Sequence, residues 1–522
     1  MSHRFPGRKL SLFRLTLLAA VVALLAAGAY IGWGRYNDAQ AASAEPAIFA
    51  GYVDVTATPA YGFESPVSDA GKSVVLSFIV AAKDNPCEPS WGTFYSMDQA
   101  AGQELDLDRR IARLLQQGGS VSVSFGGQAN DELALTCTNV DQLRDAYASV
   151  VERYNLSTID LDLEGAGLAD STALKRRALA VAGLQSERLA AKKPLSVWLT
   201  LPVAPTGLTA EGTAAVAAML DANVDLAGVN LMTMDFGGSK AAGTTMLQAS
   251  TAAAQATHGQ LDALYKAHGQ DIGSDSLWRK IGLTPMIGQN DVADEIFTLE
   301  DAVGLHDFAV AKGVGRVSMW SLNRDATCGP NYPDLTRVSD ACSGVDQKGQ
   351  LFSTLLGEGL KTPQAEASPS ASVQASAQAT LPADNPATSP YPIWSGLAVY
   401  VEGDRIVWHG NVYAAKWWTQ DEVPDNPVAT DGRTPWQLIG PVLPGDKPAA
   451  QVTAPAGTYA LWSADKTYLQ GQRVMFNGRI FEAKWWNREE SPLAALQGSP
   501  SSAWTMFSNT QVQQLLATKS AK

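Results

Sequence analysis

Residues that bind metals or nucleic acids are scarce in this chain of 522 residues. Its five histidines and four cysteines are scattered, without the close spacing of a metal site. Lysine and arginine form no block beyond the first 14 residues, the formal net charge is −13, and no glycine-rich loop suggests a phosphate site. These absences argue against a nucleic-acid partner and favour an uncharged substrate, and they predict neither a cofactor nor a metal.

The length and the pattern of the chain indicate more than one domain, the largest being an α/β domain. Hydrophobic residues make up 46% of the chain, enough for an ordinary core. Short β-rich runs alternate with alanine-rich helical stretches, such as 174–191 and 211–222. The eight predicted strands are 48–55, 73–80, 120–125, 159–164, 195–201, 227–234, 280–287 and 316–320. This order predicts a (β/α)8 TIM barrel over residues 47–360, with a doubly wound open sheet as the alternative.

The fourth predicted strand carries three acidic residues in alternation. In a strand, Asp160, Asp162 and Glu164 share one face, and the aliphatic residues between them take the other. Carboxylates roughly 7 Å apart repel one another, and burial adds to the cost. The pattern therefore favours a catalytic centre over its alternative, a solvated acidic face on an edge strand. Glu164, nearest the strand end, is the candidate acid.

Other chemically useful side chains lie near the ends of predicted strands. Asp235 ends the sixth strand, Trp320 ends the eighth, and Asp54 lies near the end of the first. Barrel enzymes place their chemistry at the carboxyl ends of the strands. The sequence therefore predicts one shared active-site mouth.

These segments together resemble glycoside hydrolase family 18, the chitinase family. Asp160-x-Asp162-x-Glu164 is similar to its fourth-strand signature and is the most specific element of a resemblance that covers about residues 47–360. Other similar elements are Ser124-Phe-Gly126-Gly127, Met232-Thr-Met234-Asp235-Phe236, the tryptophan Trp320 that would underlie the reacting sugar, and Pro285-Met-Ile-Gly-Gln289, which would line the pocket.

The resemblance implies a mechanism in which the substrate supplies the nucleophile. The 2-acetamido oxygen of an N-acetyl sugar would attack with retention of configuration, while Glu164 protonates the leaving oxygen. Asp162 would orient the acetamido group, and Asp160 would support Asp162. Where the family has a tyrosine hydroxyl before the sixth-strand aspartate, this chain has Met234, so Tyr52 or Asp235 would have to replace that donor.

The N-terminal segment, residues 1–46, predicts export. A basic start precedes an uncharged apolar run at 15–33, which fits either a membrane anchor or a cleaved signal segment. We expect an extracellular or cell-surface monomer. Export makes disulfides plausible, and we predict the pairs Cys87–Cys137 and Cys328–Cys342 from their positions after predicted strands.

The C-terminal third repeats a small aromatic unit. An Ala/Ser/Pro-rich linker at 361–390 precedes predicted modules at 391–442 and 459–508, which are joined by 443–458. Six aromatic or glycine positions of the first module recur 68 residues later, including the identical Ala-Lys-Trp-Trp cores at 415–418 and 483–486. The modules resemble chitin-binding modules of carbohydrate-binding families 5 and 12. We expect Trp417, Trp418, Trp485 and Trp486 to be exposed for sugar stacking, and Trp394 and Trp462 to be more buried.

Together these features predict an exported chitinase with two chitin-binding modules. The alternatives are a non-hydrolytic chitin-binding protein, which Met234 would favour, and an endo-N-acetylglucosaminidase acting on glycans.

Overall fold

The computed structural model describes residues 47–330, 332, 337–361, 383–396, 398–425, 434–448, 454–496, 501–507, 512 and 515. The chain divides into two units on either side of residue 371. The predicted anchor or signal run at 15–33 and most of the predicted linker at 361–390 lie outside the described residues, so those boundaries stay predictions. Among the described residues, no helix is long and apolar enough to cross a membrane.

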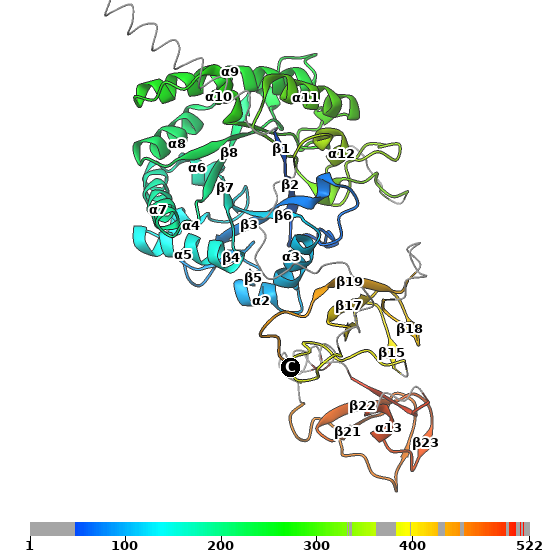
Figure 1. The fold of residues 1–522 in the computed structure, drawn as a ribbon. Coiled ribbons are helices and arrows are strands. Elements are labelled where there is room, and N and C mark those ends of the chain that lie inside the picture. The colour runs from blue at the N-terminus through cyan, green and yellow to red at the C-terminus, as the bar shows by residue number, and fades with distance from the viewer. Residues whose placement is uncertain are drawn as a thin grey trace, which may run out of the picture. The chain divides into compact units, whose positions relative to one another are not determined.

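The first unit is the predicted barrel (Figure 1). All eight predicted strands are present, with the first one split in two. The strands of the ring are β1 (Ile48–Phe49) with β2 (Gly51–Asp54), β3 (Ser73–Ala81), β6 (Ser120–Gly126), β7 (Thr158–Asp162), β8 (Ser196–Ala204), β10 (Leu226–Met232), β11 (Ile281–Thr284) and β14 (Arg316–Val317). Neighbours in this order pair in parallel.

The split first strand closes the ring. β1 pairs with β14, and β2 pairs with β3 on the other side. Between them, Ala50 N–H donates to the carbonyl of Val317, and Tyr52 N–H donates to that of Met319. The first strand therefore joins the last strand to the second, and the open-sheet alternative is wrong.

Helices cover the outside of the ring (Figure 1). They are α2 (Met97–Ala101), α3 (Leu107–Gln116), α4 (Leu133–Thr136), α5 (Val140–Arg153), α6 (Gly165–Ala169), α7 (Ser171–Ala190), α8 (Ala210–Asp221), α9 (Met246–Ala267), α10 (Ser274–Arg279), α11 (Leu299–Lys312) and α12 (Phe352–Gly357). Short elements in the connections are η1 (Ala70–Lys72), β4 (Pro89–Trp91), β5 (Tyr95–Ser96), β9 (Gly207–Leu208), η2 (Gly237–Ser239), β12 (Gly288–Gln289), β13 (Ile296–Phe297) and η3 (Leu322–Arg324).

The alternation in β7 works as its sequence predicts. Ile159, Leu161 and Leu163 are fully buried in the hydrophobic core that the strands share with the helices. Their burial directs the acidic side chains of the same segment to the opposite face, because successive side chains of a strand point to opposite sides.

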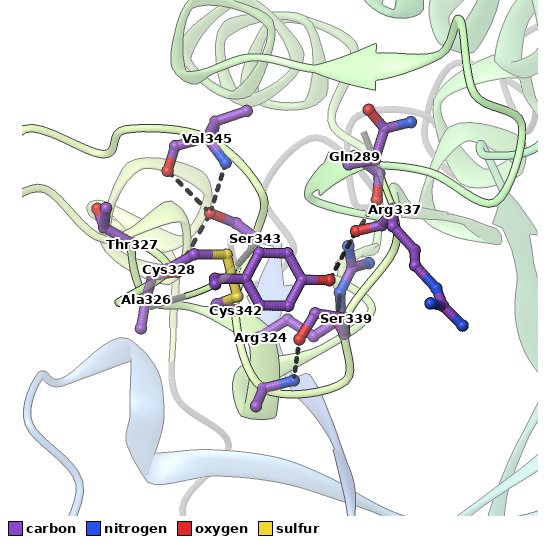
Figure 2. The surroundings of a disulfide bond; sticks show 12 residues. Gln289, Arg324, Ala326, Thr327, Cys328, Arg337, Ser339, Cys342, Ser343 and Val345 are labelled. Carbon is purple, nitrogen blue, oxygen red and sulfur yellow. Dashed lines mark hydrogen bonds between the residues drawn. A yellow bond between two sulfur atoms is a disulfide. The ribbon is translucent and has the colours of Figure 1, made fainter. Parts of the chain in front are cut away.

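Both predicted disulfides, Cys87–Cys137 and Cys328–Cys342, are present. Figure 2 shows the second disulfide, in the segment after β14, where Ser343 and Arg324 form hydrogen bonds to neighbouring backbone. The Ser343 carbonyl accepts from Gln289 N–H at 2.8 Å, and Arg324 donates to the carbonyls of Ser339 and Gln289. This disulfide therefore fixes a segment that braces the loop following β11.

The second unit contains the two small all-β repeats. The first holds β15 (Val399–Tyr400), β16 (Arg405–Trp408), β17 (Asn411–Ala415), β18 (Thr419–Gln420) and β19 (Trp436–Pro441). The second holds β20 (Thr467–Tyr468), β21 (Arg473–Phe476), β22 (Arg479–Ala483), β23 (Asn487–Arg488), α13 (Leu493–Leu496) and β24 (Trp504–Met506). Each repeat buries one tryptophan, Trp436 or Trp504, whose indole N–H donates to a backbone carbonyl at 2.8 Å.

Candidate active site

A pocket opens at the carboxyl ends of the barrel strands. Thirteen side chains line it: Tyr52, Phe78, Gln128, Asp162, Glu164, Thr200, Met232, Met234, Asp235, Thr284, Met286, Asp291 and Trp320. Six of these are predicted site residues from four different strand ends, so the folded barrel brings together positions that lie up to 268 residues apart.

Asp160 lies beneath this pocket and is fully buried. Its Oδ2 accepts hydrogen bonds of 2.8 Å from the hydroxyls of Tyr52 and Ser124. Its Oδ1 accepts from Thr200 Oγ1 at 2.8 Å and from the Arg316 guanidinium at 3.0 Å. Four donors, one of them a cation, satisfy this carboxylate, which makes it a fixed support and not a group for substrate contact.

Asp162 is the next acidic residue along the strand and forms part of the pocket wall. Burial raises the pKa of its carboxyl well above the usual range, and the neighbouring charges of Glu164 and Asp160 add to this, while Arg316 opposes it. Its Oδ1 is buried and has no hydrogen-bond partner among the described residues. An unsatisfied oxygen at a pocket wall can accept from, or when protonated donate to, a bound ligand.

Glu164 lies two residues beyond the end of β7, in extended backbone at the start of α6. Burial, and then the nearby charge of Asp235, raises the pKa of Glu164 to about 7. A carboxylic acid with that pKa still carries its proton in a substantial fraction of molecules at neutral pH. This is the property that a general acid requires.

Asp235 is held in place from the loop that follows β11. Its backbone N–H donates to Asn290 Oδ1 at 3.3 Å, and its own Oδ1 accepts from Val292 N–H at 3.1 Å. Its φ of 47° is a left-handed conformation uncommon for a residue with a side chain. Burial raises the pKa of Asp235 as well. These contacts keep a second carboxyl group beside Glu164.

Aromatic rings form one side of the pocket. Trp320 stacks on Phe78 with ring centroids 5.5 Å apart and planes inclined by 22°, and it lies 6.2 Å from the ring of Tyr52. A flat indole held in this way offers a face on which the apolar side of a sugar ring could stack.

The second unit presents the predicted exposed tryptophans. The exposed fractions are 45% for Trp417 and Trp485, and 61% for Trp418 and Trp486. Trp394 and Trp462 are only half-buried but less exposed than these four, as expected. Lys416 and Lys484 lie over the rings of Trp417 and Trp485, at 4.7 and 5.7 Å from the ring centroids. Two similar aromatic surfaces therefore occur in tandem.

Within the part of the chain that the structure describes, no three His, Cys, Asp or Glu side chains group together as a metal site would require.

Known proteins resemble both units. Residues 461–505 match the model of carbohydrate-binding module family 5/12. The chain is 36% identical over 293 residues to the probable bifunctional chitinase/lysozyme of Escherichia coli (strain K12), and 34% identical over 285 residues to endochitinase 11 of Metarhizium anisopliae. These matches cover 54% and 53% of this chain, but the chain spans only 31% and 52% of the two relatives' lengths.

Among solved structures, the catalytic domain of a hyperthermophilic chitinase from Pyrococcus furiosus is similar, with 27% identity and a TM-score of 0.51 over 60% of this chain and 95% of that one. The barrel is thus similar in sequence and in fold to chitinases, in line with its predicted resemblance to glycoside hydrolase family 18.

One departure from the family 18 pattern is Met234, which lines the pocket without a hydrogen-bond donor. Tyr52 does not replace the missing hydroxyl. Its single hydroxyl proton is directed to Asp160, and the same oxygen lies 2.9 Å from Thr200 Oγ1 and 3.2 Å from Asn230 Nδ2. Of the two residues predicted to replace the tyrosine hydroxyl, this leaves Asp235, whose carboxyl group lies beside Glu164.

Four other predicted substrate-binding residues do not line the pocket. Ser124 acts on Asp160 instead. Gly126 and Gly127 have φ values of 105° and 85°, and a Cβ at Gly126 would lie 2.1 Å from the Asp162 carbonyl oxygen, so their role is close backbone approach. The prediction for Gln289 is wrong: its amide donates to backbone carbonyls of its own loop, including those of Asn290 and Ala293.

Sequence reasoning missed several lining residues of the pocket, chiefly Phe78, Gln128 and Asp291, whereas Met286 lies in the segment 285–289 that was predicted to line it. Phe78 lies in the last part of β3, so a search of all eight strand ends would have found it. Gln128 and Asp291 lie on loops, and no periodic pattern marks them.

Proposed function

We propose that this protein is an exported chitinase that hydrolyses β-1,4 bonds between N-acetylglucosamine units with retention of configuration. The observation that carries the proposal is the pairing of Glu164, whose pKa is raised to about 7, with the unsatisfied buried Oδ1 of Asp162 in one pocket. The first group can give up a proton near neutral pH, and the second can hold a polar group of the substrate.

The first half of the reaction breaks the glycosidic bond. Glu164 transfers its proton to the leaving oxygen, and the bond between that oxygen and the anomeric carbon breaks. The carbonyl oxygen of the substrate's own 2-acetamido group bonds to the anomeric carbon, and the positive charge spreads over the resulting oxazolinium ring. Asp162 accepts a hydrogen bond from the acetamido N–H and stabilises the positive charge of the oxazolinium ring.

The second half restores the enzyme. A water molecule gives one proton to Glu164 and attacks the anomeric carbon, and the bond to the acetamido oxygen breaks. Asp235 beside Glu164 favours the return of the proton, because a neighbouring negative charge raises the affinity of a carboxylate for it. Asp160, fixed by four donors, keeps Asp162 in place throughout.

The tandem aromatic surfaces support an insoluble polymer as the substrate. Two linked modules on one surface bind more tightly than either alone, because binding of the first raises the effective concentration of the second. A polymer of N-acetylglucosamine offers many equivalent sites for both, whereas an isolated glycan on a glycoprotein does not. This favours chitin over the endo-N-acetylglucosaminidase alternative.

Export is proposed from the sequence of residues 1–46 together with the two disulfides, which persist in oxidising compartments. We place the protein outside the cell or at its surface, acting as a monomer, either released or held by residues 15–33. The mass of the mature protein and its partition between membrane and soluble fractions distinguish a retained segment from a cleaved one.

The test is release of soluble products from colloidal chitin by the wild type and by Glu164→Gln. Glu152→Gln, an exposed substitution on α5, is the matched control. We expect release by the wild type and the control, and loss in Glu164→Gln with chitin binding intact. If a folded wild type binds chitin but releases nothing, the protein is a non-hydrolytic binder. Release from glycoproteins but not from chitin would favour the endo-N-acetylglucosaminidase.

A further inference from the structure

Glu164 is not held by the pairing of its own strand. β7 ends at Asp162, and on either side of Glu164 the backbone forms hydrogen bonds from Leu163 N–H to the Thr200 carbonyl at 3.0 Å and from Leu168 N–H to the Glu164 carbonyl at 3.2 Å. The second bond belongs to the short helix α6. The position of Glu164 therefore depends on what holds α6 against the barrel.

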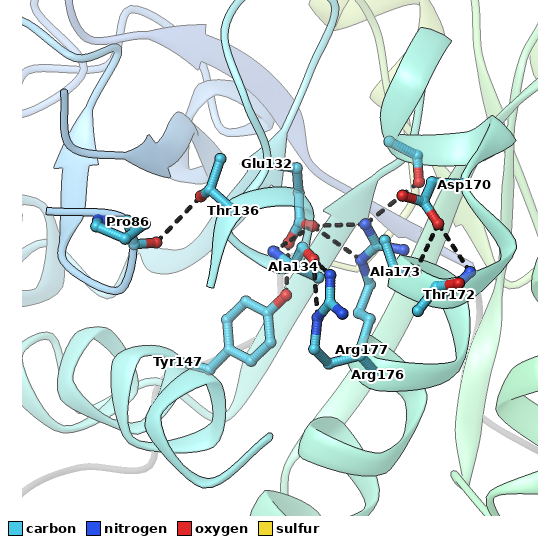
Figure 3. A network of polar contacts seen from close by, with 11 residues as sticks. Pro86, Glu132, Ala134, Thr136, Tyr147, Asp170, Thr172, Ala173, Arg176 and Arg177 are labelled. Carbon is cyan, nitrogen blue, oxygen red and sulfur yellow. Dashed lines mark hydrogen bonds and ion pairs between the residues drawn. The ribbon is translucent and has the colours of Figure 1, made fainter. Parts of the chain in front are cut away.

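A buried polar cluster packs behind that helix (Figure 3). Glu132, at the start of α4, meets Arg177 from α7 and Tyr147 from α5. Arg177 and Tyr147 are fully buried, and Glu132 is 3% exposed. One Glu132 oxygen accepts from Nε and from one terminal nitrogen of Arg177, at 3.1 and 2.5 Å, and the other accepts from the Tyr147 hydroxyl at 2.5 Å.

The cluster touches both sides of the acidic segment. The terminal nitrogen of Arg177 that binds Glu132 also donates to the carbonyl of Gly167, inside α6, at 3.3 Å. On the other side, a Cβ placed on Gly126 would lie 3.3 Å from Glu132 Cγ, and Gly126 pairs with Asp162 in the sheet. Glu132 and Arg177 thus lie between the end of the β6–β7 pair and the helix that follows Glu164.

A buried ion pair is a poor source of stability. Removing two charges from water carries a large free-energy cost, and apolar side chains of similar volume often serve folding equally well. The ion pair does supply directional hydrogen bonds, because the fixed guanidinium of Arg177 donates to one carboxylate and to one helix carbonyl. Such geometry is needed where the position of a catalytic group must be held closely.

We propose that Glu132 and Arg177 are positioning residues that hold α6, and through it Glu164, in the productive place. The proposal rests on the proposed function, because it assigns Glu164 as the acid. Tyr147 completes the hydrogen bonding of Glu132 and keeps it oriented toward Arg177.

The test uses a double variant, Glu132→Leu with Arg177→Met. It removes both charges together, so no unpaired charge stays buried, and folding is preserved better than in either single variant. Arg144→Met is the matched control, because Arg144 pairs at the surface with Asp141, Asp145 and Glu187 on α5 and α7, the helices that carry Tyr147 and Arg177. The readouts are kcat and KM on a soluble chitooligosaccharide, their pH profiles, the thermal midpoint and chitin binding.

For the double variant we expect a kcat at least ten-fold lower with a KM within about two-fold of the wild type, since a misplaced acid affects the chemical step more than binding. The basic limb of the pH profile should move to lower pH, because a looser Glu164 is more hydrated. Chitin binding and the behaviour of Arg144→Met should stay as in the wild type.

A folded double variant with wild-type kcat and pH profile would overturn the positioning role, whatever its thermal midpoint. The positioning role would also be overturned if the double variant yielded less folded protein but kept the wild-type kcat per folded molecule and pH profile. Glu132 and Arg177 would then serve folding alone. Neither result resembles failure of the proposed function itself, which would appear as an inactive but folded wild type.

Discussion

The hydroxyl of Tyr52 donates a 2.8 Å hydrogen bond to Oδ2 of Asp160, joining the first strand of the barrel to the fourth across 108 residues of sequence. Both groups are buried, and Asp160 is further satisfied by Ser124, Thr200 and Arg316. Asp160 is therefore fully engaged beneath the pocket, and the carboxyl groups left to act on a substrate are those above it.

Tyr52→Phe tests this division of roles. Removal of the hydroxyl takes one donor from a buried carboxylate, so we expect a loss of about 1–3 kcal/mol in the free energy of unfolding and a kcat only a few-fold lower. Denaturant unfolding and kcat on a soluble chitooligosaccharide measure the two effects, with Tyr95→Phe on β5 as the control. A hundred-fold loss of kcat at unchanged stability would instead place the Tyr52 hydroxyl on the substrate.

The pH profile should report Glu164 and its neighbour Asp235. As the acid, Glu164 must be protonated, so kcat/KM should fall as the pH rises through about 7. Asp235→Asn removes a negative charge that helps to raise this pKa, so the basic limb should move to lower pH. Asp291→Asn alters another carboxyl group of the same pocket that is not a cause of the Glu164 shift, and it should leave the limb in place. If the basic limb of the pH profile does not move in Asp235→Asn, that limb reports the titration of a group other than Glu164.

The raised pKa of Glu164 also predicts how stability depends on pH. The pKa is about 7 in the folded protein against an ordinary 4.5, so between these values the folded state binds more protons than the unfolded state, and stability falls as the pH rises. Glu164→Gln removes this penalty. At pH 8 the variant should be more stable than the wild type by up to about 3 kcal/mol, and at pH 4 the two should be nearly equal. Denaturant unfolding at both values measures this, and an equal difference at both would contradict it.

The sequence predicted the parts of the site that repeat a regular pattern. The alternation around Asp160 and Asp162 places one set of side chains in the core and the other at the barrel axis, because strand geometry fixes the direction of each side chain. The cysteine pairs were predictable because each joins segments after predicted strands. Glu132 and Arg177 were not, since an arginine in an alanine-rich helix has the same appearance whether it is exposed or buried.

The failures of prediction have a common physical cause. Gln289 lies near the pocket and Tyr52 forms part of its wall, but whether a polar group can bind a ligand depends on which nearby backbone and side-chain groups satisfy it. The amide of Gln289 donates hydrogen bonds to carbonyl groups of its own loop, and the hydroxyl of Tyr52 donates to Asp160. Such competition between partners is settled by tertiary structure and leaves no periodic signal in the chain.

Affinity for insoluble chitin should depend on the exposed aromatic pairs of the two C-terminal modules. Replacing Trp417 and Trp418 by alanine, or Trp485 and Trp486, should lower affinity for insoluble chitin by about ten-fold or more, because one anchor then has to bind without the effective concentration that the other supplies. Replacing all four should lower it further, while kcat on a soluble chitooligosaccharide stays unchanged. Leu469→Ala, at a residue 56% exposed in the second module, controls for loss of exposed apolar surface. If one pair can be removed without any change in affinity, that module does not bind the polymer, and the tandem argument for chitin over an isolated glycan loses its basis.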